Sequence, residues 1–187
     1  MRRLTTLSSA VIASLLLTAC GGGSTSTASN TGTGVYVDSV IQGADYVCGT
    51  QTGVTDETGK FTFEVNQNCT FKIGNVLLRE VQASSLSNNM TLFEDNVTVA
   101  QFLQTIDRDG DASNGIDIPS SAKTVLDSSN LTTVPTTDAE LTKVKDDLDA
   151  KDDTYTGRVV SAVETDTHLK QLEQQLHKVE IPHNTVM

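Results

Sequence analysis

Residues 46–75 read YVCGTQTGVTDETGKFTFEVNQNCTFKIGN, and this stretch decides the fold of the chain. Apolar and polar side chains alternate over residues 61–65 and again over residues 69–73. A period of two is typical of a strand that buries one face. Residues 45–48 alternate in the same way, so the stretch predicts three strands with one apolar face each. The apolar run 76–81 predicts a fourth strand.

Two cysteines lie in these predicted strands, Cys48 and Cys69. Each shares a face with an aromatic residue of its own strand, Tyr46 or Phe71, so both thiols point toward the core. They meet there if the strands lie close, and a disulfide closing this loop would stabilise the fold by about 3 kcal/mol in the chain-entropy model. Between them, residues 56–59 (Asp-Glu-Thr-Gly) predict a turn, because glycine accepts a positive φ and aspartate bonds its own backbone.

Three segments carry a family resemblance: GVYVD at 34–38, GADY at 43–46 and TDETGKFTF at 55–63. Together they resemble the transthyretin-like or carboxypeptidase-regulatory-like β-sandwich that occurs in many secreted proteins. The resemblance implies a β-sandwich that serves as a non-catalytic support or binding module. Residues 35–82 are short for a complete sandwich of that family, so later residues either supply a further strand or leave the sandwich abridged.

The composition limits both the core and the partners of this chain of 187 residues, a length that suggests one domain, or a small domain with an appendage. Aromatic residues make up 4% and tryptophan is absent, so the core is modest and a disulfide contributes more than in a large domain. The net charge is −11, and loss of residues 1–19 with their two arginines would leave −13. Nucleic acid and anionic lipid both require a basic patch, so this charge argues against them as partners and is compatible with cation binding.

The N-terminus has the pattern of an export signal. Residues 1–3 carry positive charge, residues 4–17 are mostly apolar but too short for a good membrane span, and LTAC at 17–20 follows. This ending resembles the bacterial lipobox. The resemblance implies a signal peptide over residues 1–19, a diacylglycerol on the Cys20 thiol and an acyl chain on its new amine, so that several chains hold the protein firmly at a membrane. The alternative is an ordinary secretory signal with a chance cysteine.

Residues 20–34 begin with the cysteine to be lipidated and continue as GGGSTSTASNTGTG, a composition typical of a flexible tether. Such a tether spans roughly 20 Å root-mean-square, which would hold a folded body just off a bilayer surface. Gly21 directly after Cys20 implies outer-membrane sorting in enteric-type bacteria. With one cysteine lipidated, the other two pair as expected in an oxidising compartment. The sequence thus predicts a lipid-anchored protein of the bacterial cell envelope, at the outer membrane.

Beyond residue 82 the apolar period changes to that of helices, so residues 83–187 are predicted to be a helical region. Four apolar residues at i, i+3, i+4 and i+7 predict a helix over 99–106, with a capping box at 98–101. Further helices are expected from Pro119, which suits a first helical turn, and from two more capping boxes at 137–140 and 161–164. The last helix carries an apolar seam that docks on the protein's own core or on a partner helix, formed by Leu169, Leu172, Leu176 and Val179.

The acidic stretch 107–117, DRDGDASNGID, is the strongest candidate for a binding site. Clustered carboxylates resist joint ionisation unless something positive lies among them, and calcium takes six to eight oxygens from flexible loops of this kind. The stretch resembles the start of an EF-hand-type loop, but Ala112 and Ile118 stand where that pattern has its glycine and its bidentate glutamate. An irregular calcium loop and a plain Asx- and glycine-rich turn, with Arg108 and solvent balancing the charge, therefore both remain open. The candidate calcium ligands are Asp107, Asp109, Asp111 and Asp117.

The sequence contains no recognisable catalytic constellation. Its three histidines, His168, His177 and His183, are spaced by nine and six residues, which does not place them on one helix face for zinc. There is no Gly-x-Ser-x-Gly elbow and no phosphate-binding loop, and the scarcity of aromatic residues disfavours a sugar-stacking cleft. We therefore expect a protein that is not an enzyme.

The sequence as a whole predicts an α+β fold, with a small disulfide-stapled antiparallel β-sandwich-like module at 35–82 followed by three or four helices. The CGT…TGKFTFEV…CTFKIGN module, followed by a helix and DGD…NGI, also resembles a recurring architecture of bacterial lipoproteins without an assigned activity. The leading hypothesis is a membrane-anchored, non-catalytic binding or structural module whose partner is an envelope protein or polymer. The alternatives are a calcium-dependent adhesion or assembly module that uses residues 107–117, and an envelope hydrolase.

Overall fold

Nine strands and four α-helices form residues 30–180, the part of the chain that the computed structural model describes. The strands are β1 (Thr31–Val37), β2 (Ile41–Gln42), β3 (Asp45–Cys48), β4 (Gln51–Val54), β5 (Lys60–Glu64), β6 (Cys69–Ile73), β7 (Val76–Val81), β8 (Met90–Phe93) and β9 (Ile116–Asp117). The helices are α1 (Val97–Thr105), α2 (Ser120–Ser128), α3 (Asp138–Lys151) and α4 (Ala162–Glu180). This mixed content confirms the predicted α+β class.

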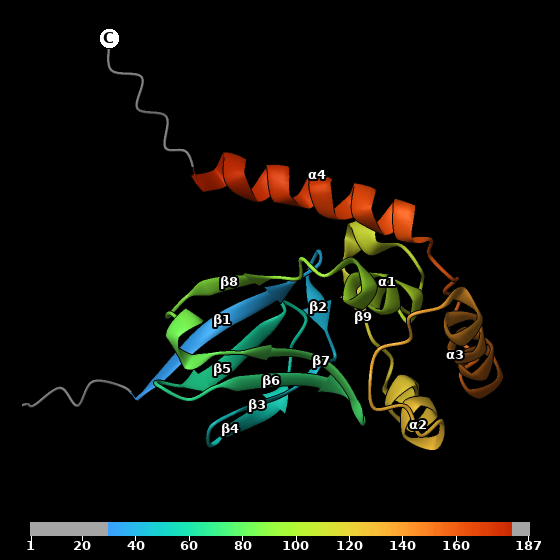
Figure 1. The fold of residues 1–187 in the computed structure, drawn as a ribbon, viewed down its shortest axis with the longest axis horizontal. Coiled ribbons are helices and arrows are strands. Elements are labelled where there is room, and N and C mark those ends of the chain that lie inside the picture. The colour runs from blue at the N-terminus through green and yellow to red at the C-terminus, as the bar shows by residue number, and fades with distance from the viewer. Residues whose placement is uncertain (1–29, 181–187) are drawn as a thin grey trace, which may run out of the picture.

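The strands form two larger sheets and one small one (Figure 1). β4, β3, β6 and β7 make an antiparallel four-stranded sheet in that order. β5, β1 and β8 make a three-stranded sheet, in which β5 is antiparallel and β8 is parallel to β1. β2 and β9 pair in parallel over two residues each, which ties the early part of the chain to the segment after α1.

Aromatic side chains join the two larger sheets face to face. The ring centroid of Phe71, in the four-stranded sheet, lies 4.8 Å from that of Tyr36 and 5.0 Å from that of Phe61 in the other sheet. Tyr46 also contacts Phe61, at 6.2 Å and edge to face. Such pairs contribute about 0.5–1.5 kcal/mol each beyond the area they bury. The predicted sandwich-like packing is therefore present.

The alternation of apolar and polar residues locates β3, β5 and β6 where the structure has them, and the apolar run 76–81 locates β7. Phe61 and Phe63 of β5 are buried, as is every second residue of β6 from Cys69 on. Val65 is predicted to extend the buried face of β5, but the strand ends at Glu64 and Val65 is 39% exposed. The next residue, Asn66, has a φ of 66°, which turns the chain away from the sheet.

β1 begins at Thr31, inside the segment 20–34 whose composition predicts a tether. Two glycines explain the difference, because Gly32 and Gly34 lie under the rings of Phe63 and Phe61. A Cβ atom at these glycines would stand 2.4 and 2.5 Å from the nearest ring atoms, so the rings can pack there only against glycine. Glycines that suggest flexibility in the sequence are thus packing positions in a strand.

β8 lies beyond residue 82, in the region predicted to be helical, and completes the three-stranded sheet. It is the further strand that the family resemblance leaves to later residues. Its four residues contain one buried position, Leu92, so the sequence shows no alternation there. Its parallel pairing is made with β1, far away along the chain, and a local pattern carries no information about such a partner.

α1 starts two residues before the helix that its apolar periodicity predicts. The side chain of Asn96 accepts hydrogen bonds from the backbone N–H groups of Thr98 (3.0 Å) and Val99 (3.4 Å), which makes Asn96 the N-cap. The predicted capping box at 98–101 is therefore wrong, since a side chain two positions earlier already satisfies the first free N–H groups of the helix.

The capping boxes predicted at the starts of α3 and α4 are present. Thr137 and Glu140 exchange side-chain and backbone hydrogen bonds at the start of α3. Ser161 and Glu164 do the same before α4, with distances of 3.1 and 3.3 Å. Each pair satisfies two N–H groups that would otherwise lack a partner.

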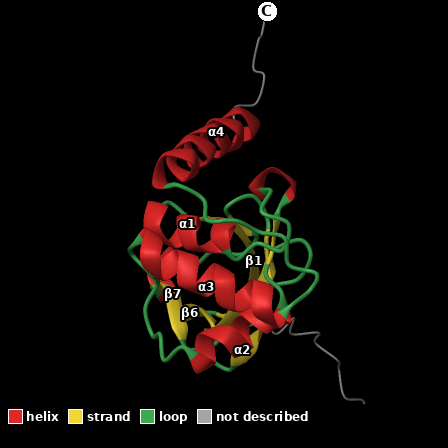
Figure 2. Ribbon diagram, turned by 90° about the vertical axis from the view of Figure 1, so that its right-hand side faces the viewer, coloured by secondary structure: helices red, strands yellow, loops and turns green. Residues whose placement is uncertain are grey.

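α1, α2 and α3 gather at one end of the sandwich (Figures 1 and 2). α2 packs against α3 and β6, and α1 packs against α3 and α4. β1 starts at the opposite end of the sandwich, so the described chain begins away from these three helices. Within residues 30–180, no helix is both long enough and apolar enough to cross a membrane.

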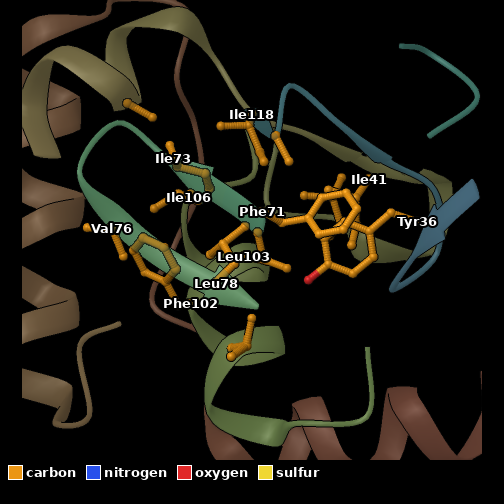
Figure 3. Packing of buried hydrophobic residues seen from close by; sticks show 14 of the residues in the cluster. Tyr36, Ile41, Phe71, Ile73, Val76, Leu78, Phe102, Leu103, Ile106 and Ile118 are labelled. Carbon is orange, nitrogen blue, oxygen red and sulfur yellow. The ribbon is translucent and has the colours of Figure 1, made fainter. Parts of the chain in front are cut away.

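One hydrophobic core runs from the sandwich into the helices (Figure 3). Tyr36 and Phe71 of the two sheets belong to it together with Phe102, Leu103 and Ile106 of α1, and all five are fully buried. The strands and α1 therefore share their apolar surface, and the β module is not a separate unit with a core of its own.

Candidate functional site

Cys48 and Cys69 form the predicted disulfide. They face each other across β3 and β6, with an S–S distance of 2.03 Å, and both residues are fully buried. The bond closes the loop that contains β4 and β5. Because it lies inside the sandwich, out of reach of a ligand, we assign it a structural role.

The predicted lipidation site, Cys20, lies outside the described residues. The predicted signal peptide at 1–19 and the first part of the tether lie outside them as well, as does His183. The lipid anchor therefore stays a prediction from the sequence.

The acidic loop after α1 uses two of its carboxylates to fold itself. Asp109 accepts hydrogen bonds from the backbone N–H of Asp111 (3.0 Å) and from the side chain of Asn114 (2.9 Å). Asp111 caps the short 3-10 helix Ala112–Asn114 by accepting a hydrogen bond of 3.1 Å from the N–H of Ser113. These are Asx turns, which the plain-turn interpretation of the sequence expects.

Asp117 is turned toward a different partner. Its carboxylate accepts a hydrogen bond of 2.7 Å from Nε of Arg108. The same guanidinium donates to the hydroxyl of Thr154 (2.8 Å) and lies 3.8 Å from Asp152, which ties the loop to the end of α3. Arg108 thus balances the charge of Asp117, as the plain-turn interpretation also expects.

Asp107 differs from the other acids of the loop because it is buried, with 1% of its surface exposed. Its Oδ1 accepts a hydrogen bond of 2.8 Å from the backbone N–H of Asp117, whereas its Oδ2 is buried without a hydrogen-bond donor among residues 30–180. Burial, together with the nearby carboxylates of Asp109 and Asp117, raises the pKa of Asp107 to about 7. A carboxyl in this environment is stable at neutral pH only with a proton or with a positive ion beside it.

The structure therefore brings two of the four candidate ligands together. The carboxyl groups of Asp107 and Asp109 lie within hydrogen-bonding reach of each other, while Asp111 and Asp117 have other partners. Among residues 30–180, no three His, Cys, Asp or Glu side chains are grouped so that they could hold a metal ion. A cation in this loop would rest on two carboxylates, with its remaining oxygens from the backbone or from water.

A second buried polar cluster joins the end of β1 to α1 and α4. Asp38 is fully buried, and the side-chain amide of Gln104 donates to its two carboxylate oxygens at 3.2 and 3.0 Å. The oxygen of the same amide accepts a hydrogen bond of 3.1 Å from the hydroxyl of Thr165 in α4. One turn further along α4, Nε2 of His168 lies 3.3 Å from Oδ1 of Asp38.

Aspartate, histidine and serine meet in this cluster, but not in the arrangement that nucleophilic catalysis needs. The hydroxyl of Ser39 lies 3.3 Å from Nε2 of His168, the same nitrogen that faces Asp38. In a catalytic triad the acid binds one ring nitrogen and the nucleophile binds the other. Since both oxygens share one nitrogen here, the cluster lacks the geometry of a triad, and we interpret it as the attachment of α4.

A third buried carboxylate, Glu94, has a full set of partners. It accepts hydrogen bonds from the hydroxyl of Tyr36 (2.5 Å) and the backbone N–H of Asn96 (3.0 Å), and the guanidinium of Arg79 lies 3.5 Å away. Burial raises the pKa of Glu94, and these partners oppose that effect. A carboxylate satisfied in this way by the fold itself is structural.

No sequence pattern predicts the cluster around Asp38, but α1 carries one signal for it. The helix reads VTVAQFLQT and contains no charged residue, and a helix without a charged face is typically buried on all sides. Its polar residues Gln101, Gln104 and Thr105 are indeed buried and hydrogen-bonded to later segments.

No protein-family model, no curated protein and no solved structure matches this chain.

Proposed function

We propose that this protein is a lipoprotein of the bacterial cell envelope, held at a membrane through Cys20, whose folded body is a non-catalytic binding or structural module. The observation that supports this best is the order of segments: residues 1–17 with the pattern of an export signal, LTAC at 17–20, a polar glycine-rich stretch, and then a disulfide-bonded body. A structural disulfide is characteristic of proteins outside the reducing cytoplasm. The outer membrane is the proposed destination.

The position of β1 determines how an anchored body would be oriented. β1 starts at the end of the sandwich that is opposite to α1, α2 and α3 (Figure 1). The chain between Cys20 and Asn30 reaches roughly 17 Å if it behaves as a flexible linker. The anchored body would therefore present its helical end away from the bilayer.

The charges favour the same orientation. Residues 94–161, which include α1, α2 and α3, contain 14 Asp and Glu against six Lys and Arg, a net charge of −8, whereas residues 30–93 contain six against three, a net charge of −3. Anionic lipid surfaces repel acidic segments, which directs the helical end outward. We propose that this acidic end meets the partner, an envelope protein or polymer that carries cationic groups.

Metabolic labelling with a palmitate analogue in a bacterial host tests the anchor. The wild-type chain is expected to take up the label and to sediment with membranes, and Cys20→Ser is expected to lose both properties. The double variant Cys48→Ala/Cys69→Ala is the matched control, because it removes the other two cysteines and leaves the lipobox intact. A wild-type chain without label would overturn the proposal.

One observation favours a second candidate, a calcium-dependent adhesion or assembly module. Oδ2 of Asp107 is buried beside the carboxylate of Asp109, with no hydrogen-bond donor in the described part of the chain. A calcium ion between the two carboxylates would supply the missing positive charge and displace the proton that Asp107 otherwise holds.

Thermal unfolding at about pH 8, with millimolar calcium or with excess chelator, tests this second candidate. Calcium is expected to raise the Tm of the wild type by several degrees and to have no effect on Asp109→Ala. Asp153→Ala is the matched control, because this acid is exposed and lies outside the loop. Identical melting curves for the wild type with calcium and with chelator would leave the loop as a turn.

A further inference from the structure

α4 is attached to the body by few side chains. Within residues 162–178, Thr165 and Leu169 are the only buried residues, Leu172 and Leu176 are half-buried, and Val163 is 76% exposed. The helix lies along the outside of the molecule, next to α1 (Figures 1 and 2). Its apolar contact with the body is therefore small, and its polar contacts decide whether it docks.

The polar contacts converge on Asp38. Gln104 binds both oxygens of this buried carboxylate and also holds Thr165, while His168 faces Oδ1 directly. A buried carboxylate is strongly unfavourable unless positive charge or hydrogen bonds compensate it. Among the groups of residues 30–180 that contact Asp38, His168 is the one that can bring a positive charge, and α4 carries it.

The imidazole of His168 is accessible to solvent protons. Its side chain is 21% exposed, and two small cavities of about 190 and 110 Å³ lie beside it. The residue can therefore change its protonation state while α4 stays docked.

We propose that Asp38 and His168 form a pH-sensitive latch, in which α4 docks most tightly when His168 is protonated and loosens when His168 is neutral. A protonated imidazole gives the buried carboxylate a charge-assisted hydrogen bond, whereas a neutral ring gives it a weaker one. The latch is a conformational response of the folded body and is independent of the proposed anchor.

The groups around His168 determine the direction of the response. They are Asp38 at the end of β1, Asp111 in the acidic loop and Glu164 on α4 itself, with the base Arg158 lining the same cavity. The hydrogen bond to Asp38 raises the pKa of His168 above 6.5, against the opposing effect of burial. Because the folded-state pKa is raised, the latch is fully engaged below the unfolded value of 6.5 and weakens as the pH rises through the folded-state value.

Hydrogen exchange of the whole protein at about pH 5.5 and about pH 8.5, corrected for intrinsic exchange rates, tests the latch. α3 is the internal reference, because its sequence, DAELTKVKDDLDAK, contains no histidine. Relative to α3, protection of the amides in residues 166–178 is expected to fall at the higher pH. The expected fall is roughly threefold for each half unit by which docking raises the pKa of His168.

Two variants and one control make the test specific. His168→Gln keeps a hydrogen-bond donor but does not titrate, so the protection of α4 is expected to be equal at both pH values. Asp38→Asn removes the negative charge next to the imidazole, so the protection of α4 is again expected to be equal at both pH values. This second variant decides the test if His168→Gln does not fold. His177→Gln, at an exposed histidine of the same helix, is expected to behave like the wild type. The proposal is overturned if wild-type protection does not depend on pH, or if the dependence persists in His168→Gln.

Discussion

At the scale of one residue, Asp107 is a carboxyl group that the acidic loop needs for a hydrogen bond but holds in a buried position. Its Oδ1 binds the N–H of Asp117 and so closes the base of the acidic loop, from which β9 starts. The same position buries Oδ2 where residues 30–180 offer it no hydrogen-bond donor, and burial raises the pKa of Asp107 to about 7. The residue that closes the loop is therefore also one whose ionisation destabilises the fold.

Asp107→Asn is expected to stabilise the protein at about pH 8 by about 1–3 kcal/mol, because the amide can accept from Asp117, donate to Asp109 and carry no charge. The folded-state pKa of Asp107 lies above its usual value of 3.8. Its contribution to the free energy of unfolding is therefore fully present below pH 3.8 and is lost as the pH rises through about 7. Urea unfolding at several pH values, with a chelator present, measures the difference.

The two chains should become equally stable as the pH falls toward 4, where Asp107 is protonated in the folded protein. A variant that is less stable than the wild type at about pH 8 would show that the carboxylate has a partner there that an amide cannot replace.

At the scale of elements, the sequence predicts best those strands whose order is local. β5 and β6 alternate over five residues each, so their period of two is visible, and β7 follows them in the chain as an apolar run. The start of β1 shows no such alternation, because its buried positions include Gly32 and Gly34, where rings from β5 fill the space. β8 shows no alternation either, because four residues are too few to show a period.

Gly34→Ala tests whether these glycines are packing positions. The new Cβ would lie 2.5 Å from the ring of Phe61, in the core, so the free energy of unfolding is expected to fall by about 1–3 kcal/mol in urea. Gly53→Ala is the matched control, because its Cβ would meet the hydroxyl end of half-buried Tyr46, which can move aside. The control is expected to change stability by less than about 1 kcal/mol. Equal stability of Gly34→Ala and wild type would mean that residues 31–34 do not need to pack as a strand.

At the scale of the whole molecule, the features that sequence patterns miss are those made by distant segments. The contact between Ser39 and His168 joins residues 129 positions apart, and the pair Tyr36–Glu94 joins residues 58 positions apart. Asp38 and His168 each look like ordinary surface residues in their own segments. By contrast, the disulfide could be predicted, because both cysteines lie on the apolar faces of strands that alternation identifies.

The arrangement of the whole molecule also explains the orientation that we propose. The start of β1 and the acidic helical end lie at opposite ends of one continuous core, so an anchor before β1 would hold the partner-facing end at a distance from the membrane. This arrangement depends on the anchor at Cys20.

Mass spectrometry of the N-terminal peptide, from full-length protein expressed in a bacterial host and extracted from its membranes, tests whether Cys20 carries this anchor. The expected peptide begins at Cys20 and carries the mass of a diacylglyceryl group on sulfur and an acyl chain on the amine. A peptide that begins elsewhere, or an unmodified Cys20, would contradict it.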